Sequence, residues 1–341
     1  MTGSSLRVAV LGAGYFSRFH HESWARMGRA ELVGVADHRL ERAAQTGHPA
    51  FGSLEQMLER TRPDIVDIVI PPAGHGDAIK TALAFGVRAI ICQKPFCADL
   101  SQAREMTARA RAAGIPLIVH ENFRFQPWYR RIAQAMGEGR IGSPLQATFR
   151  LRPGDGQGPR AYLDRQPYFR QMPRLLIHET GVHWIDTFRF LFGMPVAVYA
   201  DLRRINPAIA GEDAGYVLFD HPGGVRALFD GNRHLDHAAD NTRRTMGEAL
   251  IEGTQGTLSL GGGGAVTLRA FGDPSVQTLL APDSSPGFGG DCVHRLQSHV
   301  VAGVLDEAPF ENRAENYLAV MEVEQAIYRS AETGLKVVLA N

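Results

Sequence analysis

The sequence predicts an α/β protein in which a doubly wound parallel sheet is followed by an α+β domain with a largely antiparallel, open-faced sheet. Two patterns carry this prediction. Up to residue 122, short runs of branched apolar residues alternate with helical patterns, as in successive βαβ units. From residue 123, apolar and polar residues alternate within runs that hairpin signals join. We therefore expect two domains, at residues 1–122 and 123–341.

Length and composition fit this organisation. The 341 residues suffice for two domains of ordinary size, and 44% of them are hydrophobic. Lys plus Arg and Asp plus Glu number 36 each, so no net charge attracts nucleic acid or a membrane surface. No apolar run approaches the roughly 20 residues that span a bilayer, and no signal-peptide pattern is present. The three cysteines lack metal or disulfide spacing. We expect a cytoplasmic protein that binds neither metal, membrane nor nucleic acid.

The first strand and the residues after it form a dinucleotide-binding fingerprint. Leu6–Leu11 is a buried-strand pattern that leads into Gly12-Ala13-Gly14 and then a helix. Gly12 permits the tight turn, and Gly14 lets a pyrophosphate approach the backbone and the helix N-terminus. Ser17 replaces the third glycine and is still small. The pattern predicts a Rossmann dinucleotide site.

The next strand, residues 31–36, ends on an acidic residue. Asp37 lies 37 − 14 = 23 positions after Gly14, where roughly 20 is typical for the acid that accepts the ribose hydroxyls. A carboxylate repels a 2′-phosphate, so NAD is expected over NADP, although Arg39 would soften that choice. The remaining elements of this half follow in βαβ order. Helices are expected at 40–45, 53–60, 74–85 and 99–113, and strands at 64–70, 87–92 and 117–120.

Polar residues follow these strands at their carboxyl ends, where parallel sheets bind ligands. Pro71-Pro72, Gln93-Lys94 and Glu121-Asn122 occupy such positions. Lys94 stands between a buried strand and Pro95, so its position is fixed. An ammonium beside a nicotinamide can stabilise the charge that develops on a substrate oxygen. A surface lysine is the commoner role for this residue type, but the setting favours catalysis.

The second half is built from helices and alternating strands. Helices are expected at 127–138, 174–192, 291–305 and 313–332, and strands at 146–152, 196–202, 215–220, 225–230, 250–252 and 257–260. Residues 152–173 have no periodicity and are long for a loop, which indicates an active-site loop. Glu179 and His183 are four residues apart on the 174–192 helix, so they are expected on one face. A carboxylate there would raise the basicity of the imidazole. On spacing alone, an ordinary helix histidine is the more frequent reading.

The chain resembles the Gfo/Idh/MocA oxidoreductases over essentially its whole length. The marks of the resemblance are Gly12-Ala13-Gly14, Pro72 with His75, Gln93-Lys94-Pro95, residues 121–127, Gly139-Arg140-Ile141-Gly142 and residues 179–186. The resemblance implies that Lys94 and His183 are the catalytic pair and that Glu179 assists. The family usually has Glu-Lys-Pro, so Gln93 is a departure that removes a charge beside the lysine.

The resemblance also implies which residues bind ligands. The cofactor residues are Gly12, Gly14, Tyr15, Phe16, Asp37, Pro71, Pro72, His75, Gln93, Lys94 and Asn122. The substrate residues are Arg124, Arg152, Tyr162, Arg165, Tyr168 and His183.

The implied activity is NAD-dependent oxidation of a sugar or cyclitol hydroxyl, with an aldose giving a lactone. Residues 122–129 and Tyr168-Phe169-Arg170 resemble D-apiose dehydrogenases within the family. Two alternatives remain open: an NAD-dependent glycoside hydrolase on the same fold, and a cofactor-sensing regulator without catalysis. The open face of the second sheet predicts a homodimer or homotetramer, because such faces are commonly covered by another subunit.

Overall fold

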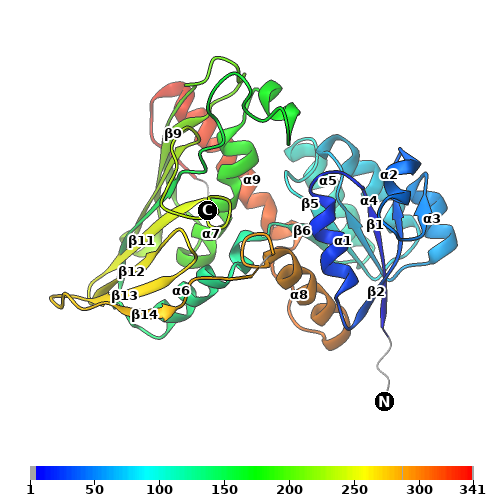
Figure 1. The fold of residues 1–341 in the computed structure, drawn as a ribbon, viewed down its shortest axis with the longest axis horizontal. Helices are drawn as coiled ribbons and strands as arrows, with labels where there is room; N and C mark the ends of the chain where they lie inside the picture. Colours follow the sequence, from blue (N-terminus) through cyan, green and yellow to red (C-terminus); the bar gives the residue numbers. More distant parts are fainter. Residues whose placement is uncertain (1–4, 286, 340–341) are drawn as a thin grey trace. The chain divides into compact units, whose positions relative to one another are not determined.

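The structure is a computed structural model that describes residues 5–285 and 287–339 (Figure 1). The chain forms two compact units. The first comprises the residues up to Asn122 together with Val293–Ala319, and the second comprises Phe123–Cys292 together with the residues from Val320 onward. The segment Val293–Ala319 thus returns to the first unit, although the sequence analysis places it in the second domain.

The first unit contains a six-stranded sheet in the order β3-β2-β1-β4-β5-β6. All of its strand pairs are parallel. The strands are β1 Leu6–Leu11, β2 Ala30–Ala36, β3 Ala50–Phe51, β4 Ile65–Ile68, β5 Ala89–Gln93 and β6 Leu117–His120. This order is that of a doubly wound Rossmann sheet, which confirms the predicted fold class. The strands are buried on both faces, so they read as continuous apolar runs.

Helices follow the strands of this sheet as expected (Figure 1). They are α1 Ser17–Ala25, α2 Leu40–Ala44, α3 Leu54–Thr61, α4 His75–Ala84 and α5 Leu100–Ala112, with α8 Cys292–Asp306 added from the end of the chain. Ser53 caps α3, because its hydroxyl accepts a hydrogen bond from the Gln56 amide at 3.2 Å. Asp99 caps α5 in the same way through Gln102, at 2.8 Å.

The second unit contains a nine-stranded sheet in the order β14-β13-β12-β11-β7-β10-β9-β8-β15. Its pairs are antiparallel except for β7 with β10. The strands are β7 Pro144–Leu151, β8 Ala197–Arg203, β9 Ala214–Asp220, β10 Arg226–Asn232, β11 Gly247–Gly253, β12 Gly256–Leu260, β13 Val266–Ala270, β14 Gln277–Leu280 and β15 Val337–Val338. The last three strands were not predicted from the sequence; they are short and lie at or near the two edges.

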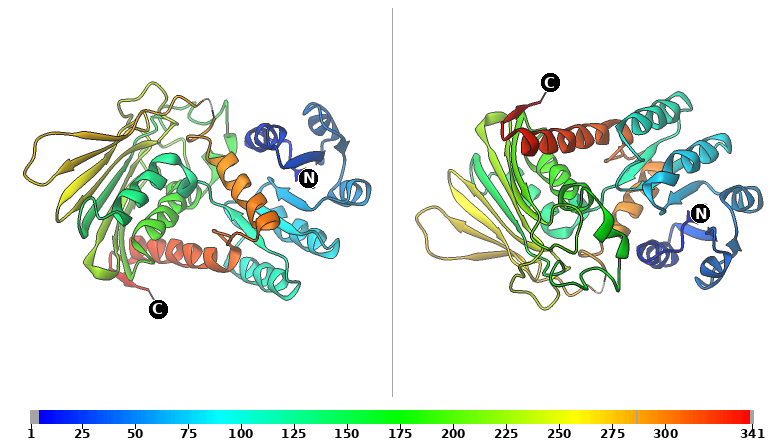
Figure 2. Two further views of the ribbon diagram at one scale, coloured as in Figure 1. Left: turned by 90° about the horizontal axis from the view of Figure 1, so that it is seen from below. Right: turned by 90° about the horizontal axis from the view of Figure 1, so that it is seen from above.

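One face of this sheet packs on helices, and the other is open (Figure 2). The helices are α6 Pro127–Gly137, α7 Val182–Phe192 and α9 Ala314–Thr333. Trp184 of α7 stacks on Phe149 of β7 at 4.2 Å between ring centroids and is fully buried. Tyr216, Leu218 and Leu250 lie on the opposite face and are 42%, 41% and 37% exposed. The predicted open-faced sheet is therefore present.

The helix expected at 174–192 has two parts. Leu176–Gly181 is a turn of π-helix, and α7 begins only at Val182. The Val182 amide bonds to the carbonyl of Ile177, five residues back, instead of four. The wider turn changes the angular spacing of side chains, so Glu179 and His183 are not related by regular α-helical geometry. Such turns are frequent at functional sites.

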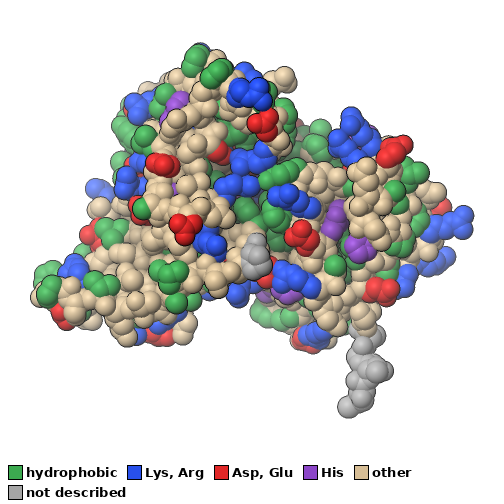
Figure 3. Space-filling model, viewed as in Figure 1, with side chains coloured by type: hydrophobic (Ala, Val, Ile, Leu, Met, Phe, Trp, Pro, Cys, Tyr) green, Lys and Arg blue, Asp and Glu red, His purple; other side chains and the backbone are tan. Residues whose placement is uncertain are grey.

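The surface carries both signs of charge. On the face in view, basic and acidic side chains are interspersed (Figure 3). Among the described residues, no helix is both long and apolar enough to cross a bilayer.

Candidate active site

The loop after β1 has the conformation that a dinucleotide site requires. Gly12 has a φ of 120°, and a Cβ atom there would lie 2.2 Å from the carbonyl oxygen of Val69. Only glycine fits at this position. A Cβ on Gly14 would meet no atom within 4 Å, so there is open space beside the N-terminus of α1. The buried Ser17 hydroxyl donates to the Gly14 carbonyl at 2.8 Å and takes the place of the third glycine. This space is suited to a pyrophosphate.

Asp37 lies beside this loop and is held by the backbone. One carboxylate oxygen accepts from the Ala13 amide at 2.9 Å, and the other accepts from the Arg39 amide at 2.9 Å. The residue is 7% exposed. The carboxylate therefore has a fixed place at the end of β2, where the ribose of a dinucleotide is bound in this fold.

The other predicted cofactor residues lie at the same edge of the first sheet. Tyr15 and Phe16 follow β1, Pro71, Pro72 and His75 follow β4, Gln93 ends β5 before Lys94, and Asn122 follows β6. His75 has a structural position: one ring nitrogen accepts from the Cys97 amide at 3.2 Å, and the other donates to the Ile70 carbonyl at 2.8 Å. Burial lowers its pKa to about 4, so the ring is neutral and joins the loops after β4 and β5.

Gln93 connects Lys94 to a buried polar cluster. Its side-chain oxygen accepts from the Lys94 amide at 2.9 Å, and its nitrogen donates to Nε2 of His20 at 2.9 Å. His20 then carries its proton on Nδ1 and donates to Asp67 at 2.8 Å. Trp24 also donates to Asp67, at 2.8 Å. Gln93, the departure from the family's usual Glu-Lys-Pro, thus donates to the unprotonated nitrogen of His20 and accepts from the Lys94 amide. These two bonds fix the backbone at Lys94.

In the second unit, His183 lies in the first turn of α7 and is 6% exposed. Its ring stacks on Phe123 at 3.8 Å between centroids, with only 2° between the planes. Trp184 packs edge-on against the same phenylalanine and donates from its indole nitrogen to the Tyr129 hydroxyl at 3.2 Å. The stack fixes the plane of the imidazole, which is the arrangement that a general base needs.

Two of the predicted substrate arginines are engaged in ion pairs within the second unit. Arg124 donates to both carboxylate oxygens of Asp186, at 2.7 Å each, and is 8% exposed. Arg152 pairs with Asp230 and also donates to the Asp230 carbonyl at 2.8 Å. These bonds favour a structural role for both guanidinium groups.

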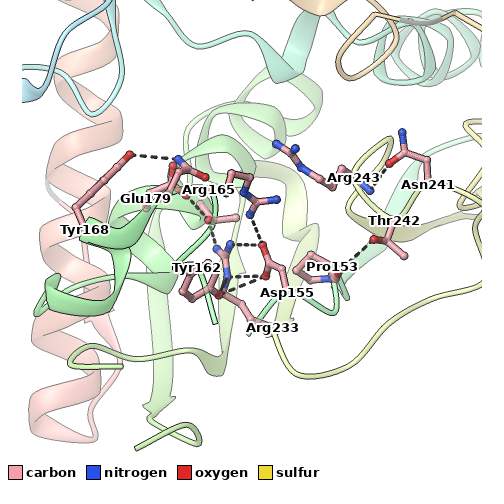
Figure 4. Close-up of polar contacts among 12 residues, drawn as sticks. Pro153, Asp155, Tyr162, Arg165, Tyr168, Glu179, Arg233, Asn241, Thr242 and Arg243 are labelled. Carbon is pink, nitrogen blue, oxygen red and sulfur yellow. Dashed lines mark hydrogen bonds and ion pairs between the residues drawn. The ribbon is translucent and has the colours of Figure 1, made fainter. Parts of the chain in front are cut away.

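The loop of residues 152–173 brings two of the other predicted substrate residues, Tyr162 and Arg165, together around Asp155, and Tyr168 lies apart from it (Figure 4). Arg165 donates to Asp155 at 2.8 Å, and Tyr162 donates to it at 3.3 Å. Tyr168 is 57% exposed and accepts from Gln166 at 3.2 Å. Burial would raise the pKa of Asp155, but the charges of Arg233 and Arg165 and their hydrogen bonds hold it below its ordinary value.

Sequence reasoning missed several polar residues that organise these regions: His20, Asp67, Asp155, Thr180 and Arg233. Asp155 stands between two glycines in the unpatterned loop, which is a usable signal. The others belong to apolar or helical patterns, and only contacts distant in sequence reveal them.

Comparisons with known proteins agree with the fold. Residues 6–121 match the Gfo/Idh/MocA family model described as an oxidoreductase family with an NAD-binding Rossmann fold, and residues 129–259 match a C-terminal domain model of the same family. A D-apiose dehydrogenase of Paraburkholderia graminis is 32% identical over 99% of this chain and 91% of its own length. A second D-apiose dehydrogenase, from Rhizobium rhizogenes, is 29% identical over 98% of this chain and 97% of its own length.

A solved structure shows the same likeness. The oxidoreductase of Agrobacterium radiobacter, crystallised with NAD+, L-tartaric acid and magnesium, superimposes with a TM-score of 0.88 at 26% identity. The match covers 98% of each chain. Together with the match of both family models, these likenesses show that the chain belongs to the Gfo/Idh/MocA oxidoreductases, whose N-terminal domain is an NAD-binding Rossmann fold.

Proposed function

We propose that the enzyme oxidises D-apiose to its lactone, with NAD as the hydride acceptor. The observation that carries the substrate assignment is the likeness to two D-apiose dehydrogenases. It extends over the loop of residues 152–173, called the substrate loop below, as well as over the cofactor domain. The cofactor assignment is supported by the open space at Gly14 beside a fixed Asp37. When NAD is bound, its nicotinamide takes up the hydride from the oxidised carbon.

The residues of the first unit hold and select the cofactor. The open position at Gly14 and the N-terminus of α1 bind the pyrophosphate. Asp37 accepts the ribose hydroxyls, and its charge disfavours a 2′-phosphate. Lys94, whose backbone Gln93 fixes, donates to the substrate oxygen and stabilises the charge that develops there.

The residues of the second unit handle the proton and the sugar. His183 takes the proton of the hydroxyl that is oxidised, and its stack on Phe123 keeps the ring in one plane. Glu179 stabilises the imidazolium that results. Arg165 and Tyr168 of the loop recognise further hydroxyl groups, with Arg165 oriented by Asp155.

A substrate panel tests this function. D-apiose, common aldoses and inositols are each supplied with NAD, and the rate of NADH formation is measured. D-apiose should give the highest kcat/KM and a lactone product. A higher kcat/KM for an inositol would show that the substrate is a cyclitol and not D-apiose. Release of a sugar from a glycoside without net NADH would instead show a hydrolase.

We also propose that a second copy of the chain covers the open sheet face. Strand register places Tyr199, Leu218, Leu228, Thr148 and Leu250 in one row across five neighbouring strands. Such a row of mostly apolar side chains is unusual on a face that water covers. The proposal predicts a homodimer or homotetramer in solution.

A further inference from the structure

We propose that Arg233 is a positioning residue that couples the loop of residues 152–173 to the carboxylate of Glu179. The inference rests on the proposed function, because it takes Glu179 as the group that assists His183. It adds a residue that lies outside the recognised sequence motifs, just after the end of β10.

Arg233 is buried, and each of the three nitrogens of its guanidinium donates a hydrogen bond. It is 1% exposed, and a buried guanidinium requires partners for its donors. Nε donates to the Tyr162 hydroxyl at 2.6 Å, and Nη2 donates to Asp155 at 3.0 Å. Nη1 donates in another direction, to the Thr180 hydroxyl at 2.6 Å. The planar group therefore holds the loop with one side and the π-helical turn with the other (Figure 4).

The hydrogen bond from Arg233 to Thr180 determines where the Thr180 hydroxyl proton points. A guanidinium only donates, so the Thr180 oxygen must accept from it. The single hydroxyl proton is then available for Glu179, whose Oε2 lies 2.7 Å away. The result is a directed chain from Arg233 through Thr180 to Glu179. It favours the ionised carboxylate and fixes the position of one of its oxygens.

The loop end of the network is strained and needs such support. Tyr162 has a φ of 67°, which a bulky side chain rarely adopts. Its ring lies under the Arg233 guanidinium at 5.2 Å, and its hydroxyl bonds to Asp155. Asp155 also holds Arg165, at 2.8 Å. The conformation of the substrate loop and the orientation of Glu179 consequently depend on one side chain.

Substitutions at Thr180 test the chain that leads to Glu179. Thr180→Val keeps the shape and removes the hydroxyl, whereas Thr180→Ser keeps the hydroxyl. Thr107→Val is the control, since Thr107 is a buried helix threonine that bonds only to the Ala103 carbonyl among the described contacts. Thr180→Val should lower kcat about three- to tenfold, as expected for one lost hydrogen bond, with little change in KM. In the pH profile of kcat/KM, the rise expected from the proposed base His183 should move to lower pH, because Glu179 then stabilises the imidazolium less. Thr180→Ser and Thr107→Val should stay near wild type.

A double mutant separates positioning from a general loss of packing. Thr180→Val combined with Glu179→Gln should be no worse than Glu179→Gln alone, because the hydroxyl acts through the carboxylate. Additive losses, or a Thr180→Val variant with the wild-type pH profile, would overturn the inference.

A second measurement does not need enzymatic activity. Hydrogen exchange is followed in residues 152–173 of wild type, Asp155→Asn and Arg233→Lys. Both variants should exchange faster in this loop, while β1 to β6 stay protected as in wild type. Asp155→Asn keeps the measurement decisive if Arg233→Lys does not fold. Unchanged exchange in the loop would overturn the proposed link. If wild type oxidises no sugar, the proposed function fails, whereas this experiment still tests the network.

Discussion

Nδ1 of His20 and a carboxylate oxygen of Asp67 lie 2.8 Å apart, and both side chains are completely buried. Gln93 links this pair to the backbone of Lys94. A buried polar cluster therefore fixes the backbone position of the proposed catalytic lysine. Gln93→Leu would leave the Lys94 amide and the His20 nitrogen without their partner. We expect a loss of about 2–3 kcal/mol in the free energy of unfolding, measured by urea denaturation, with a lower kcat.

Gln93→Glu is the matched variant for that experiment. The carboxylate still accepts from the Lys94 amide, although it has no proton to donate to Nε2 of His20. Because the bond that positions the Lys94 backbone remains, we expect kcat within about tenfold of wild type. A Gln93→Leu variant as stable and active as wild type would show that this link does not position Lys94.

The pH dependence of stability should reflect two buried neutral histidines. Burial lowers the pKa of His75 to about 4, and it is also the main reason that the pKa of His21 is lowered to about 4. Between these values and 6.5, the unfolded chain binds protons that the folded chain does not. Stability should therefore fall as the pH drops from about 6.5 to about 4, by up to about 1.4 kcal/mol per pH unit for each histidine. When the free energy of unfolding is measured by urea denaturation at several pH values, it should change less steeply with pH in His75→Gln than in wild type. Identical slopes would refute the assignment.

Cofactor preference should follow Asp37, whose carboxylate the Ala13 and Arg39 amides hold in place. Repulsion of a 2′-phosphate should give NAD at least about a tenfold advantage over NADP in kcat/KM. Asp37→Ser removes this repulsion as well as the acceptor of the ribose hydroxyls, so it should reduce that advantage by raising kcat/KM with NADP and lowering it with NAD. A wild-type preference for NADP would contradict this role and would point to Arg39.

The fold could be predicted from local patterns because the determinants of the first sheet are local. Each strand is a short apolar run, and the fingerprint places Gly12, Gly14 and Asp37 at one edge. The second sheet was recognisable from alternation in Ala147, Phe149 and Leu151. The edge strand β14 and its neighbour β13 were missed, since they are short and follow Gly- and Pro-containing turns.

The polar networks could not be predicted for a different reason. His20 and Asp67 are 47 residues apart, and Arg233 and Asp155 are 78 apart, so no sequence spacing relates them. The π-helical turn before Val182 was also unpredictable, because its five-residue hydrogen bond leaves no change in the apolar pattern. The prediction that Glu179 and His183 share one face assumed a regular α-helix. The chain instead has a π-helical turn that includes Glu179 and ends before His183.

The open sheet face should carry the oligomer contact. Leu218→Lys places a charge within the row, and this charge would be buried against the second copy. Light scattering should give a dimer or tetramer for wild type and a smaller species for Leu218→Lys. Leu40→Lys in α2, at a leucine 49% exposed in the first unit, is the control and should keep the wild-type mass. A monomeric wild type would reject the proposed interface.

The most direct test of the account is the initial rate of NADH formation when D-apiose is added to wild type and to Lys94→Ala. Tryptophan fluorescence quenching by NADH confirms that both proteins bind the cofactor. Wild type should form one NADH for each lactone. Lys94→Ala should bind NADH equally well and lose at least about a hundredfold in kcat, because Lys94 acts on charge that develops only in the transition state. No NADH formation by wild type, or the wild-type rate in Lys94→Ala, would contradict the account.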